Sequence, residues 1–169
     1  MNPRSPILAF YDGSGTDAAG RTIAEIWAWD HRRLEMVHDY IQWLFPLPEP
    51  SRFNPDAPIL STTDMSAFQR DAGLQARVHR SLDVMLDFLG LGRKEGVVIR
   101  STRFTPALDW LSPANHNHLR LTRILLFLKH AGLKRDAEAL LACLDDIASQ
   151  EGAEKILPQT LKFWRDALR

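Results

Sequence analysis

The sequence predicts an all-α fold, a single compact bundle of about six to seven helices spanning residues 1–169. Apolar residues recur at steps of three and four over most of the chain, which places them on one face of a helix. Glycines and capping residues separate these stretches. The run GVVIRS at residues 96–101 is β-branched but has no evident partner strand, so we expect an extended loop there.

Composition and charge limit the possible functions. The chain has 169 residues, 45% hydrophobic and 25% charged, which is typical of one soluble globular domain. Its 21 basic residues equal its 21 acidic residues, which excludes binding to a polyanion through bulk charge. Nucleic-acid binding would need a clustered basic face, for which the candidates are Arg93, Lys94, Arg100 and Arg103. We therefore expect no nucleic-acid partner.

Cysteine content and hydropathy predict the compartment. The one cysteine, Cys143, cannot form an internal disulfide, which favours a reducing compartment. No apolar run reaches the roughly 20 residues that a membrane helix needs. The first ten residues do not resemble a signal peptide. We expect a cytoplasmic protein with no membrane partner.

The N-terminal part is predicted to contain turns, two helices and one irregular segment. Residues 1–20 are expected to be irregular, because Gly and Asp in DGSGTDAAG favour turns. A short helix is predicted from Thr22, and Asp30 is expected to cap a longer one that must end before Pro46. Residues 46–62 contain five prolines among apolar residues, so we expect an ordered strap across the core.

Five further helices are predicted after the strap, each bounded by capping or breaking residues. They are expected at about 62–70, 73–89, 115–130, 134–149 and 158–168. The helix at 115–130 is apolar on almost every side, which is typical of the central helix of a bundle.

Polar residues gather at the start of the helix at 115–130. His116 and His118, together with Glu35 and His38 elsewhere, are residue types that bind metals. However, a single E-x-x-H pattern arises readily by chance and has no second copy here. We therefore interpret the histidine and asparagine side chains at this helix start as capping groups. No metal or cofactor is predicted.

Two arginines follow on the same helix. Arg120 and Arg123 lie three residues apart and so share one side. We favour an internal ion-pair network with carboxylates such as Glu35, Asp39 or Glu49, because buried charges usually pair with one another. The alternative is an anion pocket supported by the helix N-terminus.

Most aromatic residues have the spacing of core residues. Trp29 and Phe45, near predicted helix ends, are the best candidates to line a groove for a peptide or a partner helix. Cys143 lies where its thiol is expected to pack, and no serine lies in a nucleophile motif. These observations do not indicate an enzyme.

Several runs of the chain resemble a known family. LEMVHDYIQWLFPLPEPSRFNP at residues 34–55 and NHNHLRLTRIL at residues 115–125 closely resemble the opioid growth factor receptor conserved region. FYDG and GRTIAEIWAWD near the start extend the likeness. The closing LPQTLKFWRDAL is similar to the end of the shorter microbial members. The likeness covers most of the chain, and the run HDYIQWLFP is long and specific.

The resemblance implies a peptide-binding receptor activity and no enzyme activity. The animal member for which the family is named is a nuclear-associated binder of an enkephalin peptide, and it carries long tails beyond the conserved region. This compact chain resembles the short microbial members instead. The shared motifs include His38, Asp39, Tyr40, Gln42, Trp43, Asn115, His118, Arg120 and Arg123.

The leading hypothesis is a non-enzymatic binding module that recognises a peptide or protein partner through polar groups around residues 38–49 and 115–123. The alternative is a small-molecule or anion site, with or without catalysis, built on the His/Arg cluster of the helix at 115–130. The candidate ligand-binding residues are His38, Tyr40, Trp43, Asn115, His116, His118, Arg120 and Arg123.

Overall fold

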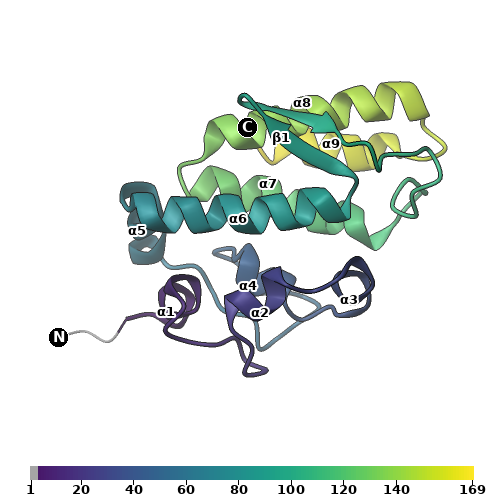
Figure 1. The fold of residues 1–169 in the computed structure, drawn as a ribbon. Coiled ribbons are helices and arrows are strands. Elements are labelled where there is room, and N and C mark those ends of the chain that lie inside the picture. Colours follow the sequence, from purple (N-terminus) through teal and green to yellow (C-terminus); the bar gives the residue numbers. More distant parts are fainter. Residues whose placement is uncertain (1–3) are drawn as a thin grey trace. The chain divides into compact units, whose positions relative to one another are not determined.

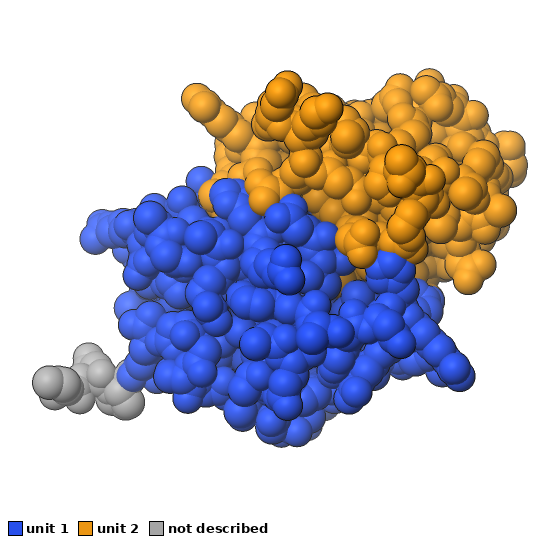
Figure 2. Space-filling model, viewed as in Figure 1, with its two compact units in different colours: residues 1–84, 130–132 blue, residues 85–129, 133–169 orange. Residues whose placement is uncertain are grey.

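The computed structural model describes residues 4–169, which form nine helices and one two-stranded sheet (Figure 1). The chain divides into two compact units, drawn in blue and orange in Figure 2. The first unit comprises the residues up to Val84 together with His130–Gly132, and the second comprises Met85–Lys129 and Leu133–Arg169. The prediction of a single domain over residues 1–169 stays a prediction, and the two units are described separately below.

Nine helices lie along residues 4–169. They are α1 (Pro6–Asp12), α2 (Ile23–Trp27), α3 (His31–Met36), α4 (Ile41–Leu44), α5 (Thr62–Arg70), α6 (Ala72–Phe88), α7 (His116–His130), α8 (Lys134–Glu151) and α9 (Pro158–Asp166). The five helices expected after the strap are confirmed as α5 to α9. Ser61 begins α5 with a reciprocal capping box, in which its side chain and that of Asp64 each accept the other residue's backbone N–H.

The expected all-α class is wrong, because the structure is helix-rich but contains an antiparallel sheet. Strand β1 (Leu91–Lys94) pairs with β2 (Val97–Arg100), so the run that we expected to be a loop is a strand. Glu95 and Gly96 join the strands with φ of 52° and 80°, the two positive values that a tight type I′ hairpin turn requires. The partner strand reads Leu-Gly-Arg-Lys, with no β-branched residue, so its composition did not indicate a strand.

Two expectations about the N-terminal part also need correction. Residues 1–20 were expected to be irregular, but α1 forms within them because Ser5 caps it and Pro6 suits its first turn. The turns expected after it are confirmed. The longer helix expected from Asp30 to Pro46 is split into α3 and α4. Val37 adopts an extended conformation between them, which allows the Tyr40 hydroxyl to donate to the Leu34 carbonyl at 2.6 Å.

The segment at 46–62 forms the ordered strap that the sequence predicted, except that its last residue, Thr62, is the first residue of α5. Leu47 and Ile59 form an isolated parallel bridge, and the Leu60 N–H donates to the Leu47 carbonyl at 2.9 Å. The two ends of the segment between them are therefore held together within the first unit. Leu47 and Leu60 are buried there, while Ile59 is half exposed.

The first unit is organised around a buried hydrogen-bonded group. The Tyr11 hydroxyl donates to the Leu44 carbonyl at 2.6 Å and lies 2.9 Å from the Ser81 hydroxyl. The indole N–H of Trp27 also donates to Ser81 at 2.9 Å. Because Ser81 is fully buried, these contacts satisfy polar groups that have no access to water. Burial also raises the pKa of Tyr11, so its hydroxyl keeps its proton.

The second unit is built on α7, α8 and the sheet. Leu121, Ile124 and Leu125 of α7 are fully buried. Strand β2 lies against α8 (Figure 1), with Val98 on the buried side of the strand. Trp110, in the segment before α7, donates its indole N–H to the Leu89 carbonyl at 3.0 Å. Much of α7 is therefore buried, whereas Val97 and Ile99 on the other face of β2 are exposed.

Candidate functional site

The eight candidate ligand residues fall into two sets. His38, Tyr40 and Trp43 belong to the first unit, whereas Asn115, His116, His118, Arg120 and Arg123 belong to the second. Each set lies within one short segment of the chain.

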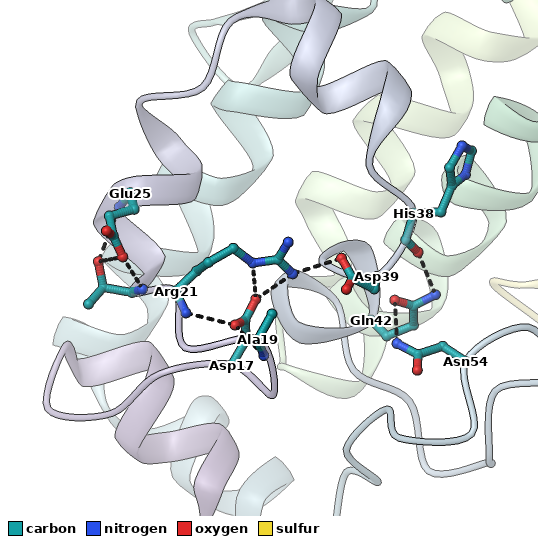
Figure 3. A network of polar contacts seen from close by, with 9 residues as sticks. Asp17, Ala19, Arg21, Glu25, His38, Asp39, Gln42 and Asn54 are labelled. Carbon is teal, nitrogen blue, oxygen red and sulfur yellow. Dashed lines mark hydrogen bonds and ion pairs between the residues drawn. The ribbon is translucent and has the colours of Figure 1, made fainter.

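The three residues of the first set differ in how much of each side chain is exposed. Tyr40 is fully buried, and its ring meets Trp29 edge-to-face with centroids 5.3 Å apart. Trp43 is only 6% exposed and meets Phe10 edge-to-face at 5.4 Å. His38 is exposed, and its ring points away from the network drawn in Figure 3. Of the three, His38 therefore presents its side chain at the surface, while Tyr40 and Trp43 support the core.

A polar network that we did not predict lies beside His38 (Figure 3). The Asp17 side chain accepts the backbone N–H groups of Ala19 at 3.0 Å and Arg21 at 2.9 Å through Oδ1. Its Oδ2 accepts the Arg21 Nε–H at 2.7 Å. Asp17 is buried, so its carboxylate both closes the turn and holds the arginine. The four-residue spacing of Asp17 and Arg21 in GTDAAGR was the signal available in the sequence.

Arg21 links this turn to an aromatic surface residue. Its guanidinium also contacts Asp39 at 2.8 Å and lies 5.1 Å from the ring centroid of Trp29. Burial acts to lower the pKa of Arg21, but the hydrogen bonds to Asp17 and Asp39 outweigh it and raise that pKa. A second guanidinium, from Arg33, lies 4.5 Å from the same ring. Trp29, which the sequence pointed to as a groove residue, is thus a half-buried indole with two cations against it.

In the second set, the start of α7 is held by local hydrogen bonds. The Asn115 side chain accepts the Asn117 N–H at 2.9 Å and donates to the Asp109 carbonyl at 3.1 Å. These contacts agree with the predicted capping role of Asn115. Arg120 is 6% exposed and donates to the Asn117 side chain at 3.3 Å. His116 is exposed and Arg123 is half buried.

His118 is a buried structural residue of the second unit. It is 4% exposed, and its Nε2 lies 2.7 Å from the Trp110 carbonyl, so this nitrogen carries the proton. Its ring meets those of Trp110 and Trp164 edge-to-face, and its carbonyl accepts the Trp164 indole N–H at 3.1 Å. Burial lowers the pKa of His118, the hydrogen bond to Trp110 opposes this, and His116 lowers it further. His118 is therefore neutral and suited to packing rather than to holding an anion.

We expect His118 to make the stability of the protein depend on pH. The unfolded chain binds a proton at the ordinary histidine pKa of 6.5, whereas the folded protein resists protonation until a lower pH. The contribution of His118 is thus fully present above pH 6.5 and is lost as the pH falls below it, with a slope of at most about 1.4 kcal/mol per pH unit. Urea unfolding between pH 7.5 and about pH 5 measures this slope.

Two variants test whether His118 causes this dependence of stability on pH. His118→Gln keeps a donor for the Trp110 carbonyl and is expected to flatten the pH dependence below pH 6.5. The matched control is Leu119→Gln, an exposed substitution on the same helix that changes no titratable group and is expected to keep the slope of the wild type. An unchanged slope in His118→Gln would show that other groups cause the pH dependence.

The described residues offer neither a cluster of metal ligands nor an activated thiol. Within residues 4–169 there is no group of three or more His, Cys, Asp or Glu side chains placed to hold a metal ion. Burial raises the pKa of the Cys143 thiol to about 11, which leaves no thiolate nucleophile at neutral pH. None of the helices formed by residues 4–169 combines the length and the apolar character needed to cross a membrane.

The basic residues considered for nucleic-acid binding are largely paired with carboxylates. Arg100 lies 2.7 Å from Asp146. Arg93 and Arg103 lie 3.6 Å and 3.5 Å from carboxylates of Asp136 and Asp87. These acids offset the charge of three of the four candidate basic residues, on which binding to a phosphate backbone would depend.

The fold defines a class of protein: a helix-rich protein of nine helices and one two-stranded antiparallel sheet within residues 4–169. Residues 8–169 match the family model described as the opioid growth factor receptor (OGFr) conserved region, and the chain belongs to this family. The resemblance seen in the sequence is thereby confirmed.

Curated relatives agree with this assignment. The opioid growth factor receptor of Mus musculus is 33% identical over 151 residues, which cover 87% of this chain and 24% of the mouse protein. That of Homo sapiens is 36% identical over 66% of this chain and 17% of the human protein. Opioid growth factor receptor-like protein 1 of Xenopus tropicalis is 37% identical over 67% of this chain and 23% of its own length. The chain thus spans about a quarter or less of these relatives. No solved structure matches it.

Proposed function

We propose that this protein is a non-enzymatic binding module for a peptide or protein partner, and that its first unit carries the binding surface. We call this the Trp29 surface; it consists of Arg21, Trp29, Arg33 and Asp39, and the exposed His38 directly precedes Asp39 in the chain. The observation that carries the proposal is the half-buried indole of Trp29 with two guanidinium groups against its ring. Trp and Arg are the residues that most often dominate binding energy at interfaces.

The contacts below this surface support the proposal. The buried Asp17 carboxylate holds Arg21 from the interior, and the buried ring of Tyr40 supports Trp29 from one side. The side chains of Arg21 and Trp29 are therefore held in place before a partner arrives. Such preorganisation lowers the conformational entropy that binding must overcome. Among the candidate residues, His38 is assigned direct contact with the partner and Tyr40 is a positioning residue.

The family supports the same class of function. The relatives are named as receptors for an opioid growth factor, so a peptide partner is the natural class of ligand to test for this chain. The alternative, an anion or small-molecule site on α7, gains less support, because His118 is buried and neutral and Arg120 already donates to Asn117.

The test is a thermal-shift screen of the purified chain against short peptides, including enkephalins, with divalent metals, nucleotides and phosphorylated metabolites in parallel. A peptide at about 100 times its Kd should stabilise the native protein by about 2.7 kcal/mol, which is readily seen as a rise in Tm. Trp29→Ala is expected to weaken binding of that peptide at least tenfold. This corresponds to about 1.4 kcal/mol or more.

The control is Leu119→Ala, which removes an exposed apolar residue of the second unit and is expected to bind as the wild type does. Peptide binding that survives Trp29→Ala would place the site elsewhere. A shift with phosphorylated metabolites but with no peptide would contradict the proposal and support the anion site.

A further inference from the structure

The strap presents one aromatic side chain almost completely to solvent. The segment from Pro48 to Pro58, which we call the strap loop, is closed at its base by the bridge between Leu47 and Ile59. Phe53 lies within this loop and is 81% exposed, the largest exposure among the large apolar residues of the described chain. A phenylalanine ring left in solvent forgoes the free energy of burial, which a partner that covers the ring would recover.

The loop holds Phe53 through hydrogen bonds within the first unit. The Ser51 hydroxyl accepts the backbone N–H groups of Phe53 at 3.3 Å and Asn54 at 3.2 Å. Asn54 accepts the Asp56 N–H at 3.2 Å through its side chain and donates to the Gln42 side chain at 3.4 Å (Figure 3). The tip is thus tied to α4 rather than moving as an open coil. Four prolines restrict the backbone further.

The charge next to Phe53 is not neutralised by the chain. Arg52 is exposed and has no ion-pair partner among residues 4–169. Glu49 and Asp56 are also exposed, on the two sides of the tip. The loop therefore carries an exposed apolar ring and, one residue before it, a guanidinium without an ion pair. The two carboxylates lie three residues away from this pair on either side in the sequence.

We propose that the strap loop is an anchor for a second, folded protein, in which Phe53 enters an apolar pocket whose rim carries a carboxylate opposite Arg52. A fixed aromatic side chain is the kind of residue that fills a partner's pocket at an interface. The carboxylate follows from charge complementarity, since an unpaired cation beside the pocket favours an acidic rim. The inference rests on the proposed function in taking the partner to be a macromolecule bound by the first unit, but it uses a separate surface.

The loop fits a protein pocket better than a lipid surface. The loop carries one exposed cation, Arg52, whereas attraction to an anionic bilayer takes a cluster of basic residues. Burial of one phenylalanine also gives only marginal membrane affinity, because stable attachment takes two signals.

The experiment replaces Phe53 with the photoreactive residue p-benzoyl-phenylalanine in the full chain, expressed in its native host. After irradiation, one discrete cross-linked product is expected, and mass spectrometry should map it to a partner segment that contains Asp or Glu. Arg52→Glu in the same chain is expected to reduce the product at least tenfold, whereas Arg52→Lys should retain most of it. The matched control places the photoreactive residue at Phe163, an exposed aromatic of the second unit, where that product should be absent.

Several outcomes would overturn the inference: no discrete product from position 53, a product that Arg52→Glu leaves unchanged, or a product with a second copy of the chain. Sedimentation with vesicles of phosphatidylcholine and phosphatidylserine checks the membrane alternative. Wild type and Phe53→Ser are both expected to stay in the supernatant, and binding that only wild type shows would contradict the inference. Trp29→Ala should leave the cross-linked product intact, so failure of the Trp29 surface and failure of the strap loop are distinguishable.

Discussion

Trp164→Ala is expected to destabilise the protein by about 3–5 kcal/mol, the cost of truncating a fully buried tryptophan. The Trp164 side chain is 0% exposed, donates its indole N–H to the His118 carbonyl at 3.1 Å and contacts the His118 ring. Its removal leaves a cavity against α7, and the His118 carbonyl keeps only the Thr122 hydroxyl as a side-chain donor. The free energy of unfolding measured by urea titration with circular dichroism checks this value.

Phe163→Ala is the matched control, because it removes an aromatic ring from the neighbouring position of α9. Phe163 is 50% exposed, so the change is expected to stay within about 0.5 kcal/mol of wild type. Equal losses in the two variants would mean that α9 does not pack through Trp164.

Asp17→Ala is expected to cost about 3 kcal/mol, near the lower limit for breaking a buried ion pair. The Asp17 side chain is 0% exposed and that of Arg21 is 18% exposed, so removal of the carboxylate leaves a partly buried cation. Two backbone N–H groups in the turn also lose their acceptor. The same unfolding measurement tests the effect. Binding at the Trp29 surface should weaken as well, because Arg21 is no longer held from the interior.

Asp39→Ala provides the comparison at the other partner of Arg21. The Asp39 side chain is 54% exposed, and an exposed ion pair contributes only about 0.2–1 kcal/mol. A loss in Asp39→Ala as large as that in Asp17→Ala would show that the buried carboxylate is not what stabilises the turn.

Local signals account for the parts of the fold that the sequence predicted. Ser61 and Asp64 form a capping box at the start of α5, and Pro158 is the first residue of α9. Such features act over three or four residues, so they are readable without knowing what packs against the helix. Family membership was predictable for a related reason, since the run HDYIQWLFP is specific by itself.

The errors in the predicted fold arose where hydrogen bonds other than those of a continuous helix outweighed residue propensity. Strand β1 has weak β propensity, yet it pairs because the turn at Glu95 and Gly96 brings it to β2 and because Leu91 becomes buried. The helix expected from Asp30 to Pro46 is interrupted at Val37, where the tertiary contact between Tyr40 and Leu34 replaces continued helix.

The sequence by itself determined most helix positions, the ordered strap and the segments from which candidate site residues come. Only the tertiary structure decided what each side chain does. Tyr40 and His118 have residue types that suit a ligand site, but they are buried and make their hydrogen bonds within the protein. Trp29 and Phe53 reach the surface instead. The physical reason is that exposure and hydrogen bonding depend on which distant residues pack around a side chain, and residue type and spacing do not record this.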